Sequence, residues 1–324
     1  MISTWDDVLN PGEVLNKASL GFILLKRVTS SMATVIVVGA SGFVGSNLVC
    51  DLRKEHKVVA LFRKQIMRFR GVTHYTYNFE DKDYLKRMMQ IVRPDVVIYA
   101  AGLHDFMDCH KRPQMADAVN ALGPMAISAA AESIPIRFIY LSTAYVFDGK
   151  KGSYNENDVV LAETTLGKTK LSGENYVRSK CQTYTIIRLS PLYGLGSYAH
   201  PSIFDKMRMV LSKGEKFEVP ENEYHSYLYI GVLTKAIDWI IKNETVNDTY
   251  HLSGLTKLTS HQFAQELARK LNLDPELLVP TRGMFPDATS LDFSMNGSKF
   301  IRQSKIDPLV LEQGFDLFKQ LLVR

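Results

Sequence analysis

The chain of 324 residues is 46% hydrophobic, which suffices for one large α/β domain with a sizeable core and a smaller lobe. Its net charge of +5 comes from 39 basic and 34 acidic residues spread along the chain, a distribution that argues against nucleic-acid binding. No apolar run reaches the roughly 18 residues that a membrane-spanning helix needs, so we expect no membrane partner. The three cysteines form no C-x-x-C pair, which indicates neither a disulfide framework nor a zinc site and favours a reducing, cytoplasmic location.

Residues 1–31 are expected to form an N-terminal extension rather than a targeting signal. Asp6, Asp7 and Glu13 precede a short apolar patch, and no small-residue cleavage site follows it, so the pattern is neither that of a secretory signal nor that of a transit peptide. The first strand then begins near Thr34.

Short β-branched runs alternate with segments of helical period from residue 34 onward. The expected strands are Thr34–Val38, Val58–Phe62, Val96–Ala100, Phe138–Ser142 and Thr185–Leu189. The expected helices are Phe43–Lys54, Asp83–Ile91, Met115–Glu132, Lys168–Ser179, Ile230–Ile241 and 258–271. This rhythm predicts an α/β fold, a doubly wound parallel Rossmann sheet with a small C-terminal α/β lobe for substrate.

The pattern also suggests how the chain is divided. We expect residues 32–190 to form the cofactor-binding domain, with residues 228–253 returning to it. Residues 191–227 and 254–324 are expected to form the lobe that meets a substrate or a partner.

The first strand runs directly into a glycine-rich turn and then into a helix, which is where a dinucleotide pyrophosphate binds. Gly39 permits the tight turn, Gly42 lets the backbone approach the phosphates, and Gly45 lets the helix pack closely on the strand. The amides at the start of the helix then face the anion. The residues expected to bind cofactor at this turn are Gly39, Ser41, Gly42, Phe43, Val44 and Gly45.

Two further strand ends belong to the predicted cofactor site. Arg63 and Lys64 follow the second strand, where an NAD-preferring protein would place an acid, and two cations suit the 2′-phosphate of NADP(H). A solvated basic turn is the alternative interpretation. The small residues Ala100, Ala101 and Gly102 close the strand that begins near Asp95, and they let the cofactor pass over the sheet edge, although tight packing alone would also explain them.

Two more segments complete a family pattern. They are 141–149, which reads Leu-Ser-Thr-Ala-Tyr-Val-Phe-Asp-Gly, and 167–174, which reads Gly-Lys-Thr-Lys-Leu-Ser-Gly-Glu. With the glycine turn and 100–102, they resemble the extended short-chain dehydrogenases/reductases, and within them the dTDP-4-dehydrorhamnose reductases and the related regulatory β subunit of methionine adenosyltransferase. The resemblance covers about residues 34–310 and implies a Rossmann fold with a nicotinamide cofactor.

The resemblance implies a reductive site of a serine or threonine, a tyrosine and a lysine, and the matching residues are Thr143, Leu166 and Lys170. The tyrosine, which donates a proton to the substrate carbonyl as hydride arrives, is therefore missing. Thr143 and Lys170 remain as the candidate catalytic pair, with Lys170 also expected to hold the nicotinamide ribose. An exposed helix lysine is the alternative interpretation of Lys170.

Other positions also depart from the family pattern. Ala144 stands where the reductases carry an aspartate, and the family's arginine and aspartate are absent near His225 and Val232. Tyr145, two residues after Thr143, would point the same way on a strand and is a substitute proton donor to consider. The resembling reductases carry a tyrosine there as well, so its presence needs no new role.

A group of metal-ligating residue types follows Gly102. Asp105, Asp108, Cys109 and His110 match no standard ligand spacing, so we interpret them as a plain loop and expect no metal.

Two functions follow from these observations. The first is an NADP(H)-binding pseudoenzyme or regulatory subunit, with a protein partner in a hetero-oligomer or a nucleotide-sugar ligand. The second is an active NADPH-dependent reductase of a nucleotide-linked 4-keto-6-deoxy sugar. Fold analogy cannot choose between them or name the partner.

Overall fold

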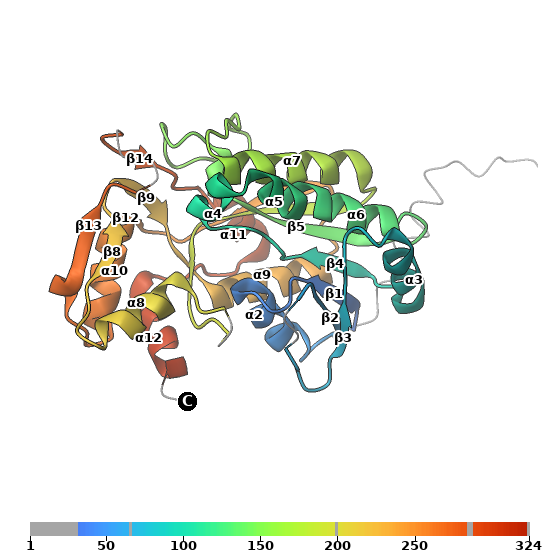
Figure 1. Ribbon diagram of the computed structural model, residues 1–324, viewed down its shortest axis with the longest axis horizontal. Helices are drawn as coiled ribbons and strands as arrows, with labels where there is room; N and C mark the ends of the chain where they lie inside the picture. The colour runs from blue at the N-terminus through green and yellow to red at the C-terminus, as the bar shows by residue number, and fades with distance from the viewer. Residues whose placement is uncertain (1–31, 65–66, 198–199, 284–287, 323–324) are drawn as a thin grey trace, which may run out of the picture.

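The computed structural model describes residues 32–64, 67–197, 200–283 and 288–322. The extension expected over residues 1–31 lies outside the described residues. The described part of the chain forms a seven-stranded sheet covered by helices on both faces, with small sheets and helices gathered beyond one end of it (Figure 1).

The large sheet has the strand order β11-β6-β5-β4-β1-β2-β3, and every neighbouring pair is parallel. Its strands are β1 (Thr34–Val38), β2 (Lys57–Phe62), β3 (Thr73–Thr76), β4 (Val96–Tyr99), β5 (Arg137–Thr143), β6 (Tyr184–Leu189) and β11 (Asp248–Leu252). The order reverses beside β1, because the chain winds outward from it in both directions, and this switch point is where ligands bind in such sheets. The prediction of a parallel Rossmann sheet is confirmed.

Helices cover both faces of the sheet because the strands are buried on both sides and carry near-continuous β-branched and aromatic runs. One face packs against α2 (Phe43–Leu52) and α9 (Ile230–Lys242). The other face packs against α3 (Lys82–Val92), α6 (Gly123–Ala130) and α7 (Thr165–Lys180). Figure 1 shows α6 and α7 along one side of the sheet and α2 and α9 along the other.

The lobe lies beyond the carboxyl ends of the central strands. Its strands are β7 (Leu192–Tyr193), β8 (Phe217–Pro220), β9 (Glu223–Ser226), β10 (Leu228–Tyr229), β12 (Lys257–Thr259), β13 (Leu278–Thr281) and β14 (Leu291–Asp292). Its helices are α8 (Ile203–Leu211), α10 (Ser260–Lys270), the 3₁₀ turn η3 (Pro275–Leu277) and α12 (Leu311–Leu322). The helix α11 (Ser298–Ser304) packs instead on the large sheet, where Phe300 contacts Tyr250 of β11 and Trp239 of α9. The strands pair as β12-β9-β14, β13-β8 and β10-β7.

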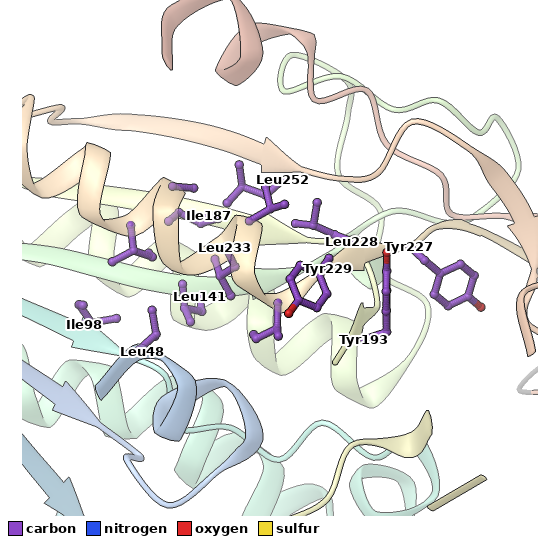
Figure 2. Close-up of a cluster of buried hydrophobic side chains, with 14 of the residues drawn as sticks. Leu48, Ile98, Leu141, Ile187, Tyr193, Tyr227, Leu228, Tyr229, Leu233 and Leu252 are labelled. Carbon is purple, nitrogen blue, oxygen red and sulfur yellow. The ribbon is translucent and has the colours of Figure 1, made fainter. Parts of the chain in front are cut away.

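A single apolar cluster joins the sheet to the lobe. Leu141 and Ile187 of the sheet and Leu233 of α9 pack at one end of it, and Figure 2 shows Tyr193 and Tyr229 continuing the cluster toward the lobe. Tyr193 in turn packs its ring against Phe263 of α10, with 5.1 Å between ring centres. This continuous core holds the lobe in place over the sheet edge.

Two expectations about helices are corrected. The segment Met115–Glu132 is not one α-helix: it comprises α5 (Pro113–Asp117), a π-helical segment η1 (Ala118–Leu122) and α6. The segment after Gly102 is not a plain loop, because it contains the short helix α4 (Phe106–Lys111), whose first turn is capped by the Asp105 carboxylate accepting from the Asp108 amide at 2.8 Å.

Candidate functional site

The glycine-rich turn after β1 leaves the start of α2 open. Gly39 has φ +83°, and a Cβ there would lie 2.6 Å from the Cα of Ala101, so only glycine fits. A Cβ on Gly45 would lie 2.2 Å from the Gly39 carbonyl oxygen, which explains the close packing of α2 on the turn. Gly42 is the N-cap of α2 and has no side chain to bond the free amides, so these amides are available to an anion. Ser41, Phe43 and Val44 complete the turn and are half-buried.

Three strand ends meet at this edge of the sheet. The amides of Gly39 and Ala40 each donate to the Leu61 carbonyl at the end of β2, at 3.1 Å. Arg63 and Lys64 therefore emerge beside the glycine turn, and both are exposed. On the other side of β1, the Ala100 amide donates to the Val38 carbonyl at 3.0 Å, which places Ala100, Ala101 and Gly102 along the turn. The residues predicted for the cofactor site at these three strand ends thus lie on one edge of the sheet.

The segment after β7 also contacts the glycine turn, and sequence reasoning missed it. The Ser197 hydroxyl donates to the Ser41 carbonyl at 3.1 Å, and the Asn47 side chain donates to the Leu195 carbonyl at 3.0 Å. Ser197 lies 156 residues from Ser41, so no local pattern links them. Asn47 on the first turn of α2 is a polar residue in an apolar helix and was the available signal.

Lys170 is buried beneath the end of β4. Its ammonium donates to the Leu141 carbonyl at 2.9 Å and lies 3.0 Å from the position that a Cβ on Gly102 would occupy. It also lies 5.2 Å from the centre of the Tyr140 ring. Burial lowers the pKa of Lys170 to about 8. The alternative interpretation of an exposed helix lysine is therefore wrong.

Leu166 precedes Lys170 by one turn of α7 and occupies an apolar cluster. It is 3% exposed and packs with Cys109 and Ala116, while Leu103 and Tyr145 cover the cluster's side. The polar groups carried by the residues of this cluster are the Tyr145 phenol and the Cys109 thiol, which donates to the Leu103 carbonyl at 3.3 Å. Burial raises the pKa of Cys109 to about 11, so the thiol is protonated near neutral pH.

The expectation that Thr143 and Tyr145 follow the side-chain alternation of a strand is wrong. β5 ends at Thr143, and Ala144–Val146 form a 3₁₀ turn, so the two-residue period of a strand does not apply. The Tyr145 hydroxyl is 3.4 Å from His225 Nε2, and its ring packs edge-on against Phe293 at 4.8 Å between centres. Burial, with the nearby Glu223 carboxylate, raises the pKa of Tyr145 well above its ordinary value of 10. The phenol is therefore a weaker acid than a free tyrosine.

Asn120 is a second residue that sequence reasoning missed. Its side chain accepts from the Leu103 amide at 3.0 Å and donates to the Leu103 carbonyl at 2.9 Å and to Thr169 Oγ1 at 3.0 Å. It lies in the π-helical segment η1 and is fully buried. These bonds fix the segment after Gly102 against α7. An asparagine inside an apolar helical pattern was the signal that could have found it.

Among the residues that the structure describes, no group of three or more His, Cys, Asp or Glu side chains is arranged to hold a metal ion. Asp105 and Asp108 are used in capping α4 and in pairing with Arg112, whose Nη2 is 2.8 Å from Asp108 Oδ2. In the described ranges, no helix is long and apolar enough to cross a membrane.

Residues 32–290 match the family described as "RmlD substrate binding domain". The chain belongs to this family. A relative named "Probable low-salt glycan biosynthesis reductase Agl14", from Haloferax volcanii, is 28% identical over 75% of this chain and 81% of its own length. "Methionine adenosyltransferase 2 subunit beta" of Rattus norvegicus is 26% identical over 76% of this chain and 74% of its own length. The resemblance inferred from the sequence is confirmed.

The fold is similar to that of a solved dTDP-4-dehydrorhamnose reductase from Bacillus anthracis in complex with NADP. The TM-score is 0.75 at 21% identity, and the match covers 89% of this chain and 98% of that one. At this identity the likeness establishes the fold alone.

A buried carboxylate ties α7 of this RmlD-family chain to the sheet. Glu174 accepts from Ser142 Oγ at 2.5 Å, from Arg188 Nε and Nη2 at 3.0 and 2.9 Å, and from Arg178 Nη2 at 2.9 Å. Burial alone would raise the pKa of Glu174, but the hydrogen bonds and charge of Arg188 outweigh it and hold this pKa below its ordinary value. The bidentate guanidinium contact explains how an ionised carboxylate is kept inside the protein.

Proposed function

We propose that this chain is an NADP(H)-binding RmlD-family protein that is catalytically impaired and serves as a binding or regulatory subunit. The observation that carries the proposal is the pairing on α7 of a buried Lys170 beside Gly102 with an apolar Leu166 one turn earlier. The lysine suits a role in holding the nicotinamide ribose. The leucine cannot donate the proton that carbonyl reduction needs.

The first part of the proposal, NADP(H) binding, is supported by the residues at the sheet edge where β1, β2 and β4 end. The open amides at the start of α2 would take the pyrophosphate, and Ala101 and Gly102 would let the dinucleotide cross the sheet edge. Arg63 and Lys64, exposed at the end of β2, would bind the ribose 2′-phosphate. A bound nicotinamide cofactor would supply or accept hydride, while this chain's residues would only bind and orient it.

The second part of the proposal, impaired catalysis, rests on the residues near Lys170 and Leu166 that could donate a proton. Thr143 could donate a hydrogen bond to a carbonyl, but an aliphatic hydroxyl is too weak an acid to supply much of the roughly 10²- to 10⁴-fold credited to general acid catalysis. Tyr145 faces His225 and Phe293, and its raised pKa makes it a poor donor. Ala144 is buried and offers no polar group.

The third part of the proposal, a regulatory role, is supported by the relative named "Methionine adenosyltransferase 2 subunit beta", whose name describes a subunit of a larger enzyme. We therefore expect a protein partner in a hetero-oligomer, or a nucleotide-sugar held without turnover, in the cytoplasm.

Calorimetry with NADPH and NADH, followed by turnover assays, tests the proposal. We expect saturable NADPH binding, weaker NADH binding, and no steady NADPH consumption across a panel of nucleotide-linked 4-keto-6-deoxy sugars. If the folded protein had no affinity for either coenzyme, the proposal of NADP(H) binding would be overturned. Sustained NADPH consumption would overturn the proposal of impaired catalysis.

One observation favours a second function, an active NADPH-dependent reductase of such a sugar. The relative from Haloferax volcanii carries the word reductase in its name and aligns over three quarters of this chain. In this case water or Tyr145 would deliver the proton. Steady NADPH consumption that Lys170→Ala abolishes is the result that would support this function.

A further inference from the structure

The buried carboxylate of Glu174 connects the helix that carries Lys170 with two strands of the sheet. Glu174 lies one helical turn after Lys170, and its partners Ser142 and Arg188 belong to β5 and β6. Lys170 itself donates to Leu141, the residue that precedes Ser142 on β5. These two contacts of α7 with β5 therefore lie at consecutive residues of β5 and one helical turn apart on α7.

The network extends beyond Glu174 to the edge of the sheet. Arg188 Nη1 is 3.4 Å from His251 Nε2 on β11, and His251 Nδ1 is 3.0 Å from the Tyr154 carbonyl oxygen. These contacts assign a neutral imidazole with its proton on Nδ1, donating to Tyr154. Burial and the neighbouring Arg188 charge agree with this, because they lower the pKa of His251 to about 3. Arg188 is thus held between His251 on one side and Glu174 on the other, and its two hydrogen bonds to Glu174 fix the position of that carboxylate.

We propose that Glu174 supports Lys170 in two ways: by binding Ser142 and Arg188 it fixes the register of α7 on β5, and its negative charge stabilises the buried Lys170 ammonium beside Gly102. The expected effect of Glu174 on NADPH binding rests on the proposed function. Its expected effect on the Lys170 titration does not, because that titration is measured in the protein without cofactor.

The groups that face the Lys170 ammonium come from several elements. They are the Cys109 thiol on α4, the Glu174 carboxylate on α7, the Tyr140 ring on β5 and His104 in the segment after β4. Burial is the main cause that lowers the pKa of Lys170, and Cys109 and Glu174 oppose it. Removing the Glu174 charge should therefore lower the pKa of Lys170 further, while removing a cation bound to Glu174 should raise it.

Two variants test the predicted fall and the predicted rise of the Lys170 pKa. Glu174→Gln keeps the shape and removes the charge, and Arg178→Met removes a partly exposed cation that donates to Glu174. The readout is the ¹³Cε resonance of Lys170, assigned with Lys170→Arg, across a pH titration. We expect a midpoint of about 8 in the unaltered chain, a fall of about half a pH unit or more in Glu174→Gln, and a smaller rise in Arg178→Met.

A core variant in the lobe, Phe318→Leu, is the matched control, because Phe318 is fully buried in α12 and should lower the melting temperature without touching α7. Its Lys170 midpoint should stay unchanged. NADPH affinity should fall about tenfold in Glu174→Gln relative to this control, a loss typical of removing one orienting contact.

Failure of the inference about Glu174 can be distinguished from failure of the proposed function. An unchanged Lys170 midpoint in folded Glu174→Gln overturns the inference, whatever happens to stability. If that variant does not fold, Arg178→Met decides, and a midpoint that stays or falls overturns it. If the unaltered chain binds no NADPH, the proposed function fails while the titration still tests Glu174.

Discussion

Leu166 and Lys170 lie one turn apart on the buried face of α7, so a side chain at position 166 points toward the same space as the Lys170 ammonium. This relationship means that the helix already presents the geometry in which a tyrosine and a lysine would act together. Under the proposed function, the group that carbonyl reduction lacks is one side chain rather than a displaced element.

We therefore expect Leu166→Tyr to give measurable NADPH consumption with a suitable keto-sugar, followed at 340 nm. A phenol is bulkier than leucine and would overpack the cluster with Cys109 and Ala116 by about 1–3 kcal/mol. The double variant Leu166→Tyr/Cys109→Ala should recover part of that stability and show the higher rate. Cys109→Ala alone is the control and should stay inactive. Full NADPH binding with no activity in either tyrosine variant would contradict the prediction.

The glycine turn allows a matched pair of substitutions. Gly39→Ala meets both a positive φ and the backbone of Ala101, whereas Gly71→Ala has φ +75° and nothing within 4 Å of the added Cβ. Gly71→Ala should cost only the backbone strain, about 1–2 kcal/mol. Gly39→Ala should cost more and should also weaken NADPH binding. Denaturant unfolding and calorimetry measure both, and equal effects of the two variants would show that the close approach to Ala101 is unimportant.

Arg63 and Lys64 should decide between the two coenzymes. The double variant Arg63→Ala/Lys64→Ala should weaken NADPH binding by roughly 10- to 100-fold, the loss expected for one or two charge-assisted hydrogen bonds to a phosphate. NADH binding should change little. The exposed pair Lys86→Ala/Arg87→Ala on α3 removes the same charge away from the turn and is the control. Equal losses for NADPH and NADH would rule out 2′-phosphate recognition by this pair.

His251 should make the protein sensitive to mild acid. Its folded pKa is about 3, below the ordinary 6.5, so the unfolded chain takes up a proton that the folded chain resists. The stability from this group is therefore complete above about pH 6.5 and is lost as the pH falls toward 3, by up to about 3 kcal/mol near pH 4. The free energy of unfolding of His251→Gln should fall less between about pH 7 and pH 4 than that of the exposed control His110→Gln.

Five of the seven strands of the sheet were predicted, because β-branched runs are local signals, whereas the edge strands β3 and β11 were not expected. The strand Thr34–Val38 was expected with the bounds that the structure has, since a β-branched run there meets a glycine that needs positive φ. The π-helical segment around Asn120 was not predicted. Its Asn120 side chain bonds Leu103, seventeen residues earlier, and no local pattern shows that contact. The turn at Tyr145 was likewise missed. The Thr143 hydroxyl accepts from the Tyr145 amide there, and the Tyr145 ring packs against Phe293, a contact distant in sequence.

The helix α4 could have been predicted. Asp105 precedes it at the N-cap position and Lys111 lies in its last turn, both ordinary signals of a short helix. The contact between Ser197 and Ser41 could not have been predicted, because it depends on how the lobe is placed over the sheet edge.

The outermost strand of the sheet, β11, has a consequence for biosynthesis. It is the last of the seven strands in chain order, and it brings His251 to Arg188 only after the ribosome has made some sixty further residues. Until then the edge of β6 is unpaired and α9 is not yet in place on the sheet. A fragment ending near residue 190 would leave that edge and the apolar face exposed, so the nascent sheet should stay aggregation-prone until the chain has returned from the lobe.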